Sequence, residues 1–257
     1  MTSALFGASG FVGGNLRAAT AFDRAFTSAD SVSAIGEAFD LVVFAAARAE
    51  KWRINQDPES DLAHIAELER LVRGVRAERF VLVSTVDVYA DPRGVDEETP
   101  IDTRDLHPYG AHRYRLEQTV REAHPGALVV RLPGLYGPGL KKNVIYDFLH
   151  DNNVDRIHRS GSFQYYGLPG LWADITTALD AGLRLVNLAS EPVRTDALAR
   201  EAFGLDFDNQ PEGVTPGSYD MRSVHARVFG ATGDYRTTAA ETLADIRRFV
   251  DAERRVP

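Results

Sequence analysis

The chain has 257 residues, of which 44% are hydrophobic and 26% charged, so it can form a packed core and is not an intrinsically disordered protein. It contains no cysteine, which excludes disulfides, thiolate metal sites, iron–sulfur clusters and a cysteine nucleophile. The formal net charge of -8 gives no basic footprint for nucleic acid, and only three of the 29 basic residues are lysines.

The sequence shows no membrane or export signal. Its longest apolar run, Leu41–Ala47, is far shorter than the ~18 residues of a membrane span, and the first residues lack a basic start. We therefore expect a cytoplasmic protein with no membrane partner.

Short apolar runs alternate with helical patterns in the first half of the chain. Strands are predicted at residues 4–6, 24–28, 41–44, 80–83 and 127–132, and helices at 11–19, 57–75 and 109–123. The second helix begins at Asp57-Pro58, because Asp suits a cap and Pro is tolerated in the first turn. This alternation predicts an α/β fold, a doubly wound parallel sheet with helices on both faces.

From Pro133 onward, glycines and prolines interrupt the pattern repeatedly. Helices are still predicted there, at residues 144–149, 171–181, 195–203, 223–229 and 238–253. We divide the chain into a first domain at 1–135 and a smaller C-terminal lobe at 136–257. The boundary is soft, and some segments of the lobe are expected to return to the sheet.

The first motif is a glycine loop between a strand and a helix, with the spacing G-x-x-G-x-x-G. Glycines permit a tight turn and let a pyrophosphate approach the backbone, where helix N–H groups and the positive dipole end meet it. An ordinary glycine-rich turn is the alternative interpretation. The residues expected to contact a dinucleotide are Gly7, Ser9, Gly10, Phe11, Val12 and Gly13.

The choice between NAD and NADP is weakly marked. Asp30 lies 20 residues after Gly10, where an acidic residue would bind the adenosine ribose hydroxyls of NAD. Arg17 and Arg24 would instead suit the 2′-phosphate of NADP. We expect NAD(P), with a slight preference for NAD.

Four further segments carry a family likeness: Ala45-Ala46-Ala47, Ser84–Tyr89, Tyr109–Arg113 and Arg131–Gly139. With them the chain resembles the extended short-chain dehydrogenase/reductase family, in its NAD-dependent epimerase/dehydratase branch. The resemblance implies a Rossmann-type dinucleotide-binding domain, a substrate-binding lobe and a nucleotide-activated sugar as substrate. It adds as cofactor contacts Ala45, Ala46, Ala47, Tyr109, Arg113, Pro133 and Leu135.

The same resemblance implies that Tyr109 transfers a proton while hydride moves between substrate and nicotinamide. The family has lysine four residues later, where this chain has Arg113, on the same helix face and with the same charge. Thr85, or else Ser84, would bind the reacting oxygen. In the alternative interpretation Tyr109 packs on a neighbour, Arg113 is a solvated charge and Thr85 binds backbone.

Asp87 occupies a place where relatives often carry a proton-transfer residue. Dehydratases have a consecutive Asp-Glu pair there, whereas this chain has Val86-Asp87. One carboxylate favours epimerisation or simple ketone reduction over dehydration. Alternatively, Asp87 only caps the turn.

The lobe is expected to contact substrate together with Thr85 and Asp87, through Asn143, Arg159, Gln164 and Arg222. No histidines show metal-ligand spacing, so no metal is expected.

Two further expectations remain. A homodimer is expected, because helix 58–75 has a second apolar face with Leu68 and Leu71, and the Tyr109 helix adds Leu116 and Val120. A rival function, favoured by Arg113, is a cofactor-binding sensor or scaffold that no longer turns over.

Overall fold

The structure, a computed structural model, describes residues 2–255 and divides them into two compact units. The first unit comprises residues 2–91, Thr99–Leu132 and Pro169–Val186. The second comprises Pro92–Glu98, Pro133–Leu168 and residues 187–255. The chain therefore passes between the units several times, and the segment at 169–186 returns to the first unit.

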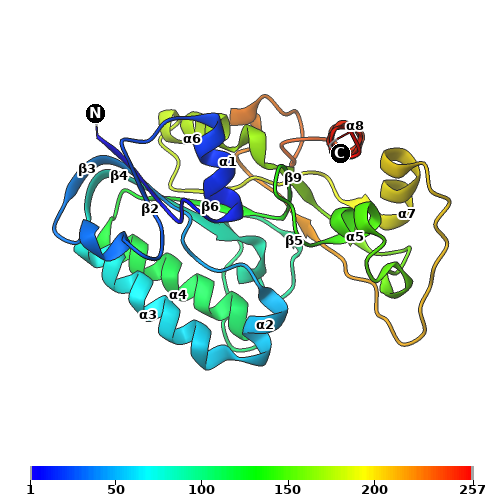
Figure 1. The fold of residues 1–257 in the computed structure, drawn as a ribbon, viewed down its shortest axis with the longest axis horizontal. Coiled ribbons are helices and arrows are strands. Elements are labelled where there is room, and N and C mark those ends of the chain that lie inside the picture. The colour runs from blue at the N-terminus through cyan, green and yellow to red at the C-terminus, as the bar shows by residue number, and fades with distance from the viewer. Residues whose placement is uncertain (1, 256–257) are drawn as a thin grey trace. The chain divides into compact units, whose positions relative to one another are not determined.

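A six-stranded sheet forms the first unit's framework, in the order β10-β6-β4-β3-β1-β2 (Figure 1). Its strands are β1 (Ser3–Phe6), β2 (Arg24–Phe26), β3 (Ala38–Phe44), β4 (Arg76–Thr85), β6 (Leu128–Leu132) and β10 (Leu185–Asn187). The successive pairs from β2 to β6 are parallel, with Phe6 opposite Phe44 and Thr85 opposite Leu132. Parallel strands end at the same edge, so the loops after β1, β3 and β4 share that edge.

Helices cover both faces of this sheet (Figure 1). One face carries α1 (Phe11–Ala19) and α6 (Leu171–Asp180), and the other carries α3 (Pro58–Gly74) and α4 (Pro108–Ala123). The start of α3 is as predicted, because the Asp57 side chain accepts a hydrogen bond from the N–H of Ser60. The predicted doubly wound α/β fold is confirmed.

A short helix that the sequence did not predict, α2 (Lys51–Gln56), precedes α3. It contacts both α3 and α4. Figure 1 shows it beside the start of both helices.

The apolar residues of α3 and α4 are buried within the chain itself. Leu68 and Leu71 are each 4% exposed, and Leu116 and Val120 are fully enclosed in the same core cluster. The exposed second face on which the dimer argument depended is therefore absent, because α3 and α4 cover each other and the sheet. The homodimer itself stays a prediction.

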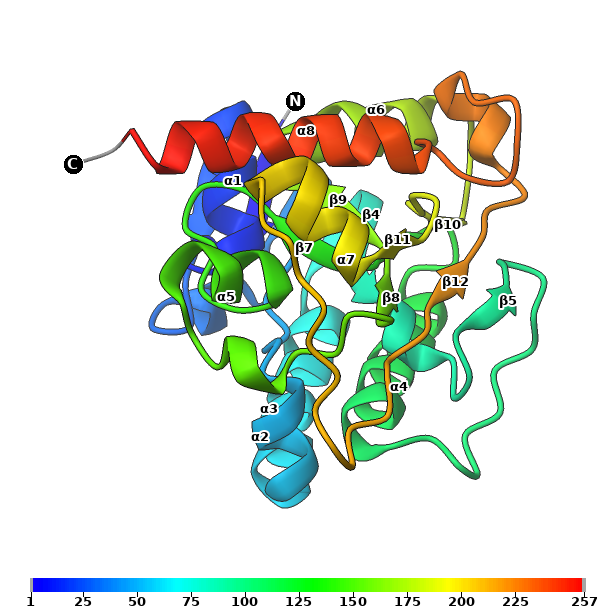
Figure 2. The same ribbon diagram turned by 90° about the vertical axis from the view of Figure 1, so that its right-hand side faces the viewer.

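The second unit is built from short strands and helices around its own apolar cluster, which includes Phe148, Phe203, Ile246 and Val250. Its strands pair as β7-β9, β8-β11 and β5-β12. Their bounds are β5 (Arg93–Val95), β7 (Gly134–Tyr136), β8 (Ser162–Phe163), β9 (Tyr165–Gly167), β11 (Val193–Arg194) and β12 (Asp220–Met221). Figure 2 shows its helices, α5 (Val144–His150), α7 (Thr195–Leu198) with a π-helical continuation (Ala199–Phe203), and α8 (Ala239–Glu253).

One predicted helix of this unit, at 223–229, is wrong. Only Ala226–Phe229 is helical, as a 3₁₀ turn, and Ser223 lies before it: its N–H donates to Asp234 O and its hydroxyl accepts from the N–H of His225.

Within residues 2–255 no helix is long and apolar enough to span a membrane, and no cluster of His, Asp and Glu suits a metal ion.

Candidate active site

The glycine loop after β1 is packed tightly against the neighbouring strand end. Gly7 has a φ of +83°, and a Cβ at Gly7 would lie 2.4 Å from the carbonyl oxygen of Ala45. A Cβ at Gly13 would lie 2.1 Å from the carbonyl oxygen of Gly7. Both positions therefore require glycine for the fold itself.

Gly10 differs from these two glycines. A Cβ there would meet only the Gly7 carbonyl oxygen, at 3.2 Å, so the protein leaves room above it. Gly10 is the N-cap of α1, and in the described chain no side chain caps this helix and its first turn has no acidic residue. The first-turn N–H groups of Phe11, Val12 and Gly13 thus form an uncapped positive helix end, which suits a pyrophosphate.

Ala45, Ala46 and Ala47 follow β3 at the same sheet edge. The N–H of Ala45 donates to Phe6 O at 3.0 Å, while Ala46 and Ala47 pack on the core. The side chains of all three alanines are partly buried. The structure therefore brings Gly7, Ser9–Gly13 and the three alanines together.

Asp30 lies four residues beyond the end of β2, in a turn. Its carboxylate accepts hydrogen bonds from the N–H and hydroxyl of Thr27, and these bonds lower the pKa of Asp30. Arg24 instead forms an ion pair with Glu37 at 3.2 Å. The ionised carboxylate is fully exposed at this corner and would oppose a 2′-phosphate.

Tyr109 and Thr85 come together at the edge of the first unit. Tyr109 opens α4 and is 7% exposed, and the Thr85 side chain at the end of β4 acts on its phenol, whose pKa it lowers. Ser84, the other hydroxyl considered, donates to Glu117 Oε1 at 2.6 Å. Thr85 is therefore the hydroxyl that faces Tyr109.

Three contacts fix the start of α4, and with it Tyr109. Asn55 Oδ1 on α2 accepts from the N–H of Tyr109 at 3.0 Å, and His107 Nδ1 accepts from the N–H of Gly110 at 3.0 Å. A Cβ at Gly110 would lie 2.1 Å from the carbonyl oxygen of Asp87. Glycine after the tyrosine is thus required for the close approach of α4 to the Asp87 turn.

Arg113 lies beneath the tyrosine ring, with its guanidinium carbon 4.7 Å from the ring centroid. It is 3% exposed and donates two hydrogen bonds of 3.0 Å to the two carboxylate oxygens of Asp61 on α3. It also donates to the carbonyl oxygen of Arg48, at 2.6 Å from Nη2. His112 Nδ1 lies 2.8 Å from the same Asp61. Arg113 is therefore a buried, doubly anchored cation and not a solvated charge.

Asp87 does not cap its turn. Thr85 does so, by accepting from the N–H of Asp87 at 3.2 Å. The carboxylate of Asp87 instead binds Lys51 of α2, with 2.7 Å between Oδ1 and Nζ.

Burial raises the pKa of Tyr109 above its ordinary value, and the charge of Asp87 acts in the same direction. The charges of Arg113 and Lys51 and the Thr85 side chain oppose this rise. The net effect keeps the phenol protonated at neutral pH, as a proton donor requires.

Sequence reasoning missed Lys51, Asn55 and Asp61. The sequence offered one signal for Lys51, the scarcity of lysine in the chain. Nothing local marked the other two, because their partners lie more than 50 residues away.

The expected substrate residues of the second unit all have partners within that unit. Gln164, 2% exposed, donates to the carbonyl oxygens of Ser190 and Met221 and accepts from the N–H of Met221. Asn143 caps α5 and donates to Leu135 O at 2.8 Å.

The two arginines of that set are bound to acidic neighbours. Arg159 pairs with Asp196 at 3.3 Å, and Arg222 pairs with Asp220 at 2.9 Å. Pro133 precedes β7, whose middle residue is Leu135. Within residues 2–255 no hydrogen bond or ion pair joins the side chains of Asn143, Arg159, Gln164 and Arg222 to one another.

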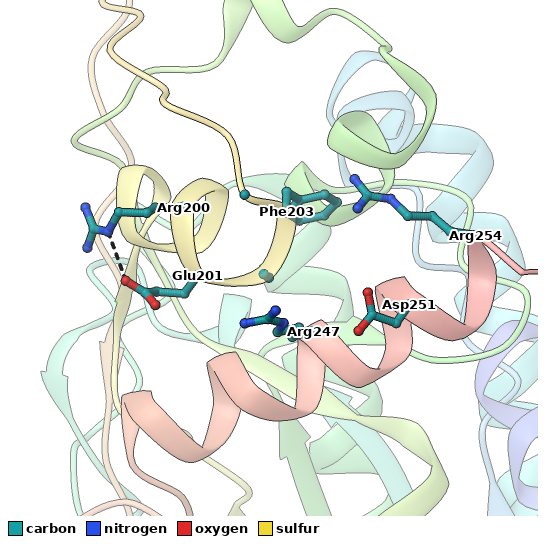
Figure 3. Close-up of a pocket in the computed structure, with 8 residues that line it drawn as sticks. Arg200, Glu201, Phe203, Arg247, Asp251 and Arg254 are labelled. Carbon is teal, nitrogen blue, oxygen red and sulfur yellow. Dashed lines mark hydrogen bonds and ion pairs between the residues drawn. The ribbon is translucent and has the colours of Figure 1, made fainter.

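A surface pocket of about 140 Å³ lies in the second unit, between the π-helical turn and α8 (Figure 3). Its labelled lining is Arg200, Glu201, Phe203, Arg247, Asp251 and Arg254. Arg200 pairs with Glu201 at 2.9 Å, and the Arg254 guanidinium lies 5.6 Å from the Phe203 ring centroid. The lining of this pocket includes none of the residues expected to bind cofactor or substrate.

Comparison with solved structures shows the same fold in three nucleotide-sugar proteins. MoeE5 in complex with UDP-glucuronic acid and NAD has a TM-score of 0.75 at 16% identity, over 98% of this chain and 100% of that one. The dTDP-4-dehydrorhamnose reductase of Bacillus anthracis in complex with NADP has 0.74 at 17%, over 98% and 99%. A UDP-galactose 4-epimerase has 0.70 at 20%, over 98% and 99%.

No curated protein matches the sequence. A family model does match, that of the NAD dependent epimerase/dehydratase family, over residues 9–170. The match spans more than half of the chain and includes most of the glycine loop, the Thr85–Asp87 turn and the Tyr109 helix. The chain therefore belongs to the NAD-dependent epimerase/dehydratase family, as its motifs indicated.

Proposed function

We propose that the protein is an NAD(P)-dependent enzyme that reduces or epimerises a nucleotide-activated sugar, with Tyr109 as the proton-transfer residue. The observation that carries this proposal is the placement of Tyr109 near Thr85 and 4.7 Å, at its ring centroid, from the Arg113 guanidinium, on the unit that also holds the glycine loop. A hydroxyl paired with a protonated tyrosine is an arrangement that can hold a carbonyl oxygen and deliver a proton to it.

The residues around the glycine loop fit a dinucleotide. The uncapped N–H groups at the start of α1 would bind the pyrophosphate, and the space left at Gly10 lets it approach. When bound, the nicotinamide supplies the hydride chemistry. Ala45–Ala47 would line the space next to it, and Asp30 would bind the adenosine ribose of NAD.

Reduction and epimerisation are favoured over dehydration by the charges in the site. Dehydration needs an acid and a base placed together, and the Thr85–Tyr89 turn supplies a single carboxylate, Asp87, which is paired with Lys51. The raised pKa of Tyr109 keeps it in the form that donates a proton to an alkoxide formed on ketone reduction.

Two measurements test this function. Cofactor binding is followed by the fluorescence of NADH and NADPH on titration with the protein, and turnover by the loss of that fluorescence with a panel of 4-keto nucleotide sugars. Epimerisation is followed by NMR of nucleotide sugars incubated with oxidised cofactor. Binding of neither cofactor, with no conversion of any sugar, would contradict the proposal.

A further inference from the structure

The cation that follows Tyr109 on its own helix is held in a buried ion pair. Arg113 and Asp61 form this pair, with two hydrogen bonds and exposures of 3% and 2%. Both partners are fixed, because Arg113 also binds Arg48 O and Asp61 also binds His112. From this fixed position the charge of Arg113 lowers the pKa of Tyr109.

A second cation reaches the site from a different helix. Lys51, the first residue of α2, places its ammonium 2.7 Å from the Asp87 carboxylate. Asp87 is adjacent to Tyr109 in space, since its carbonyl oxygen packs on Gly110 and its N–H binds Thr85. The side chains of Lys51 and Asp87 are 36% and 17% exposed, so this pair is only partly shielded from solvent.

Helix α2 holds both Asp87 and Tyr109. Lys51 and Asn55 are four residues apart and so lie on one face of α2. Lys51 binds Asp87, while Asn55 accepts from the N–H of Tyr109 at 3.0 Å. One short helix thus fixes the carboxylate turn and the first turn of α4 relative to each other.

We propose that Lys51 is a positioning residue of this site: its ammonium holds the Asp87 carboxylate beside Tyr109 and adds, from a different helix, a second cationic charge to that of Arg113. The role in turnover rests on the proposed function, whereas the electrostatic role does not depend on any substrate.

The charged and titratable groups that face Tyr109 come from four elements. They are Arg113 on α4, Asp87 on the turn after β4, Lys51 on α2 and His107 before α4. Asp87 is the anion among these four groups, so loss of Lys51 removes an ion-pair partner of Asp87 and strengthens the effect of its charge on the phenol. Loss of the Asp87 charge has the opposite effect.

The test is a titration of Tyr109 by NMR of protein labelled with ¹³C at the tyrosine ring carbon that bears the hydroxyl, with Tyr109→Phe assigning the signal. We expect Lys51→Met to move the midpoint up, and Asp87→Asn to move it down, each by about one pH unit or more. Lys51→Arg should restore the wild-type midpoint. If Tyr109 of the wild-type protein stays protonated up to the pH at which the fold is lost, the comparison is made between Asp87→Asn and the double variant Asp87→Asn/Lys51→Met. In this pair the direct effect of the ammonium on the midpoint remains.

The matched control is Arg53→Met, which removes an exposed cation paired with Glu50 on the same helix and should leave the midpoint unchanged. Circular dichroism verifies that each variant is folded. A folded Lys51→Met protein that titrates as wild type would overturn the proposal. In assays of turnover, Lys51→Met should lower kcat with little change in the KM for the cofactor. If the wild-type protein shows no turnover, that result counts against the proposed function and not against the role of Lys51.

Discussion

The two units differ in how their polar residues are used. In the first unit, Thr85, Tyr109 and the start of α1 form an arrangement whose hydroxyls and N–H groups face a common sheet edge. In the second unit, Gln164 and Asn143 use their amides to hold backbone segments together. The first arrangement is suited to a ligand, and the second to the stability of an irregular region with short strands.

The physical reason lies in secondary structure. A parallel sheet satisfies its own backbone, so side chains at its edge remain available for chemistry. In the described part of the second unit, β7-β9, β8-β11 and β5-β12 form two-stranded sheets, so many backbone groups need side-chain partners. Substitutions in five regions test this contrast, in order of decreasing expected effect.

The largest effect is expected for Tyr109→Phe, which removes the proton donor and should lower turnover by about 10²–10⁴-fold. Cofactor binding, measured by fluorescence, should change little. Tyr114→Phe, on the same helix, is the control. A Tyr109→Phe enzyme with wild-type turnover would remove tyrosine from the mechanism.

Arg113→Met should destabilise the fold by about 3–5 kcal/mol, because it leaves Asp61 buried without its main partner. Burial favours the neutral form of Asp61, but the hydrogen bonds from Arg113 and His112 outweigh it and lower the pKa of this carboxyl. The pair therefore stabilises the fold above the unfolded pKa of Asp61, and this stability is lost as the pH falls through the folded pKa.

Urea unfolding at several pH values measures both effects. Arg113→Lys keeps the charge but loses the two-point contact, so its stability should fall between those of wild type and Arg113→Met. Equal stability of all three proteins would show that the buried pair is unimportant.

Two glycines of the glycine loop are expected to affect different properties, Gly13 the stability of the fold and Gly10 the binding of cofactor. Gly13→Val should destabilise the protein severely, since its Cβ would lie 2.1 Å from a carbonyl oxygen. Gly10→Val should leave the fold intact and abolish cofactor binding by calorimetry. Gly14→Ala, whose Cβ meets nothing within 4 Å, is the control and should leave binding unchanged. Unchanged affinity in Gly10→Val would contradict the assignment of this loop to the cofactor.

Gln164→Leu addresses the second unit. The substitution removes three hydrogen bonds to buried backbone groups and should cost about 1–3 kcal/mol for each group left without a partner. Thermal unfolding measures the loss. If stability is unchanged and only the substrate KM rises, Gln164 contacts substrate and the contrast between the units is wrong.

The smallest effect is expected at Asp30. Asp30→Asn removes an exposed charge that opposes a 2′-phosphate, so the affinity for NADPH should rise modestly relative to NADH. Parallel fluorescence titrations with the two cofactors measure the ratio of the affinity for NADPH to the affinity for NADH. A fall in that affinity ratio in Asp30→Asn would show that Asp30 does not face the adenosine ribose.

The sequence predicted those parts of the fold that have local signals. A few consecutive residues were enough to predict three features: the start of α3 at Asp57-Pro58, the apolar Leu41–Phe44 segment of β3 and the glycine loop. Helix α2 was missed because six residues are too few for an apolar period.

The contacts of the site could not be predicted, because they join residues far apart in the chain. Lys51 and Asp87 are 36 residues apart, and Asp61 and Arg113 are 52 apart. The apolar second face of α3 was expected to pack on a second copy of the chain. It packs instead on α4 of the same chain, which the pattern of α3 alone does not specify.

The role of Tyr109 as proton donor is measured by the rate of cofactor oxidation on one 4-keto nucleotide sugar, for wild type, Tyr109→Phe and Asp87→Asn, from weakly acidic to alkaline pH. We expect Tyr109→Phe to lose the rate across the whole range, and Asp87→Asn to keep turnover with the alkaline limb of its pH–rate profile moved to lower pH. The opposite pattern, with Tyr109→Phe active and Asp87→Asn inactive, would contradict this role of Tyr109.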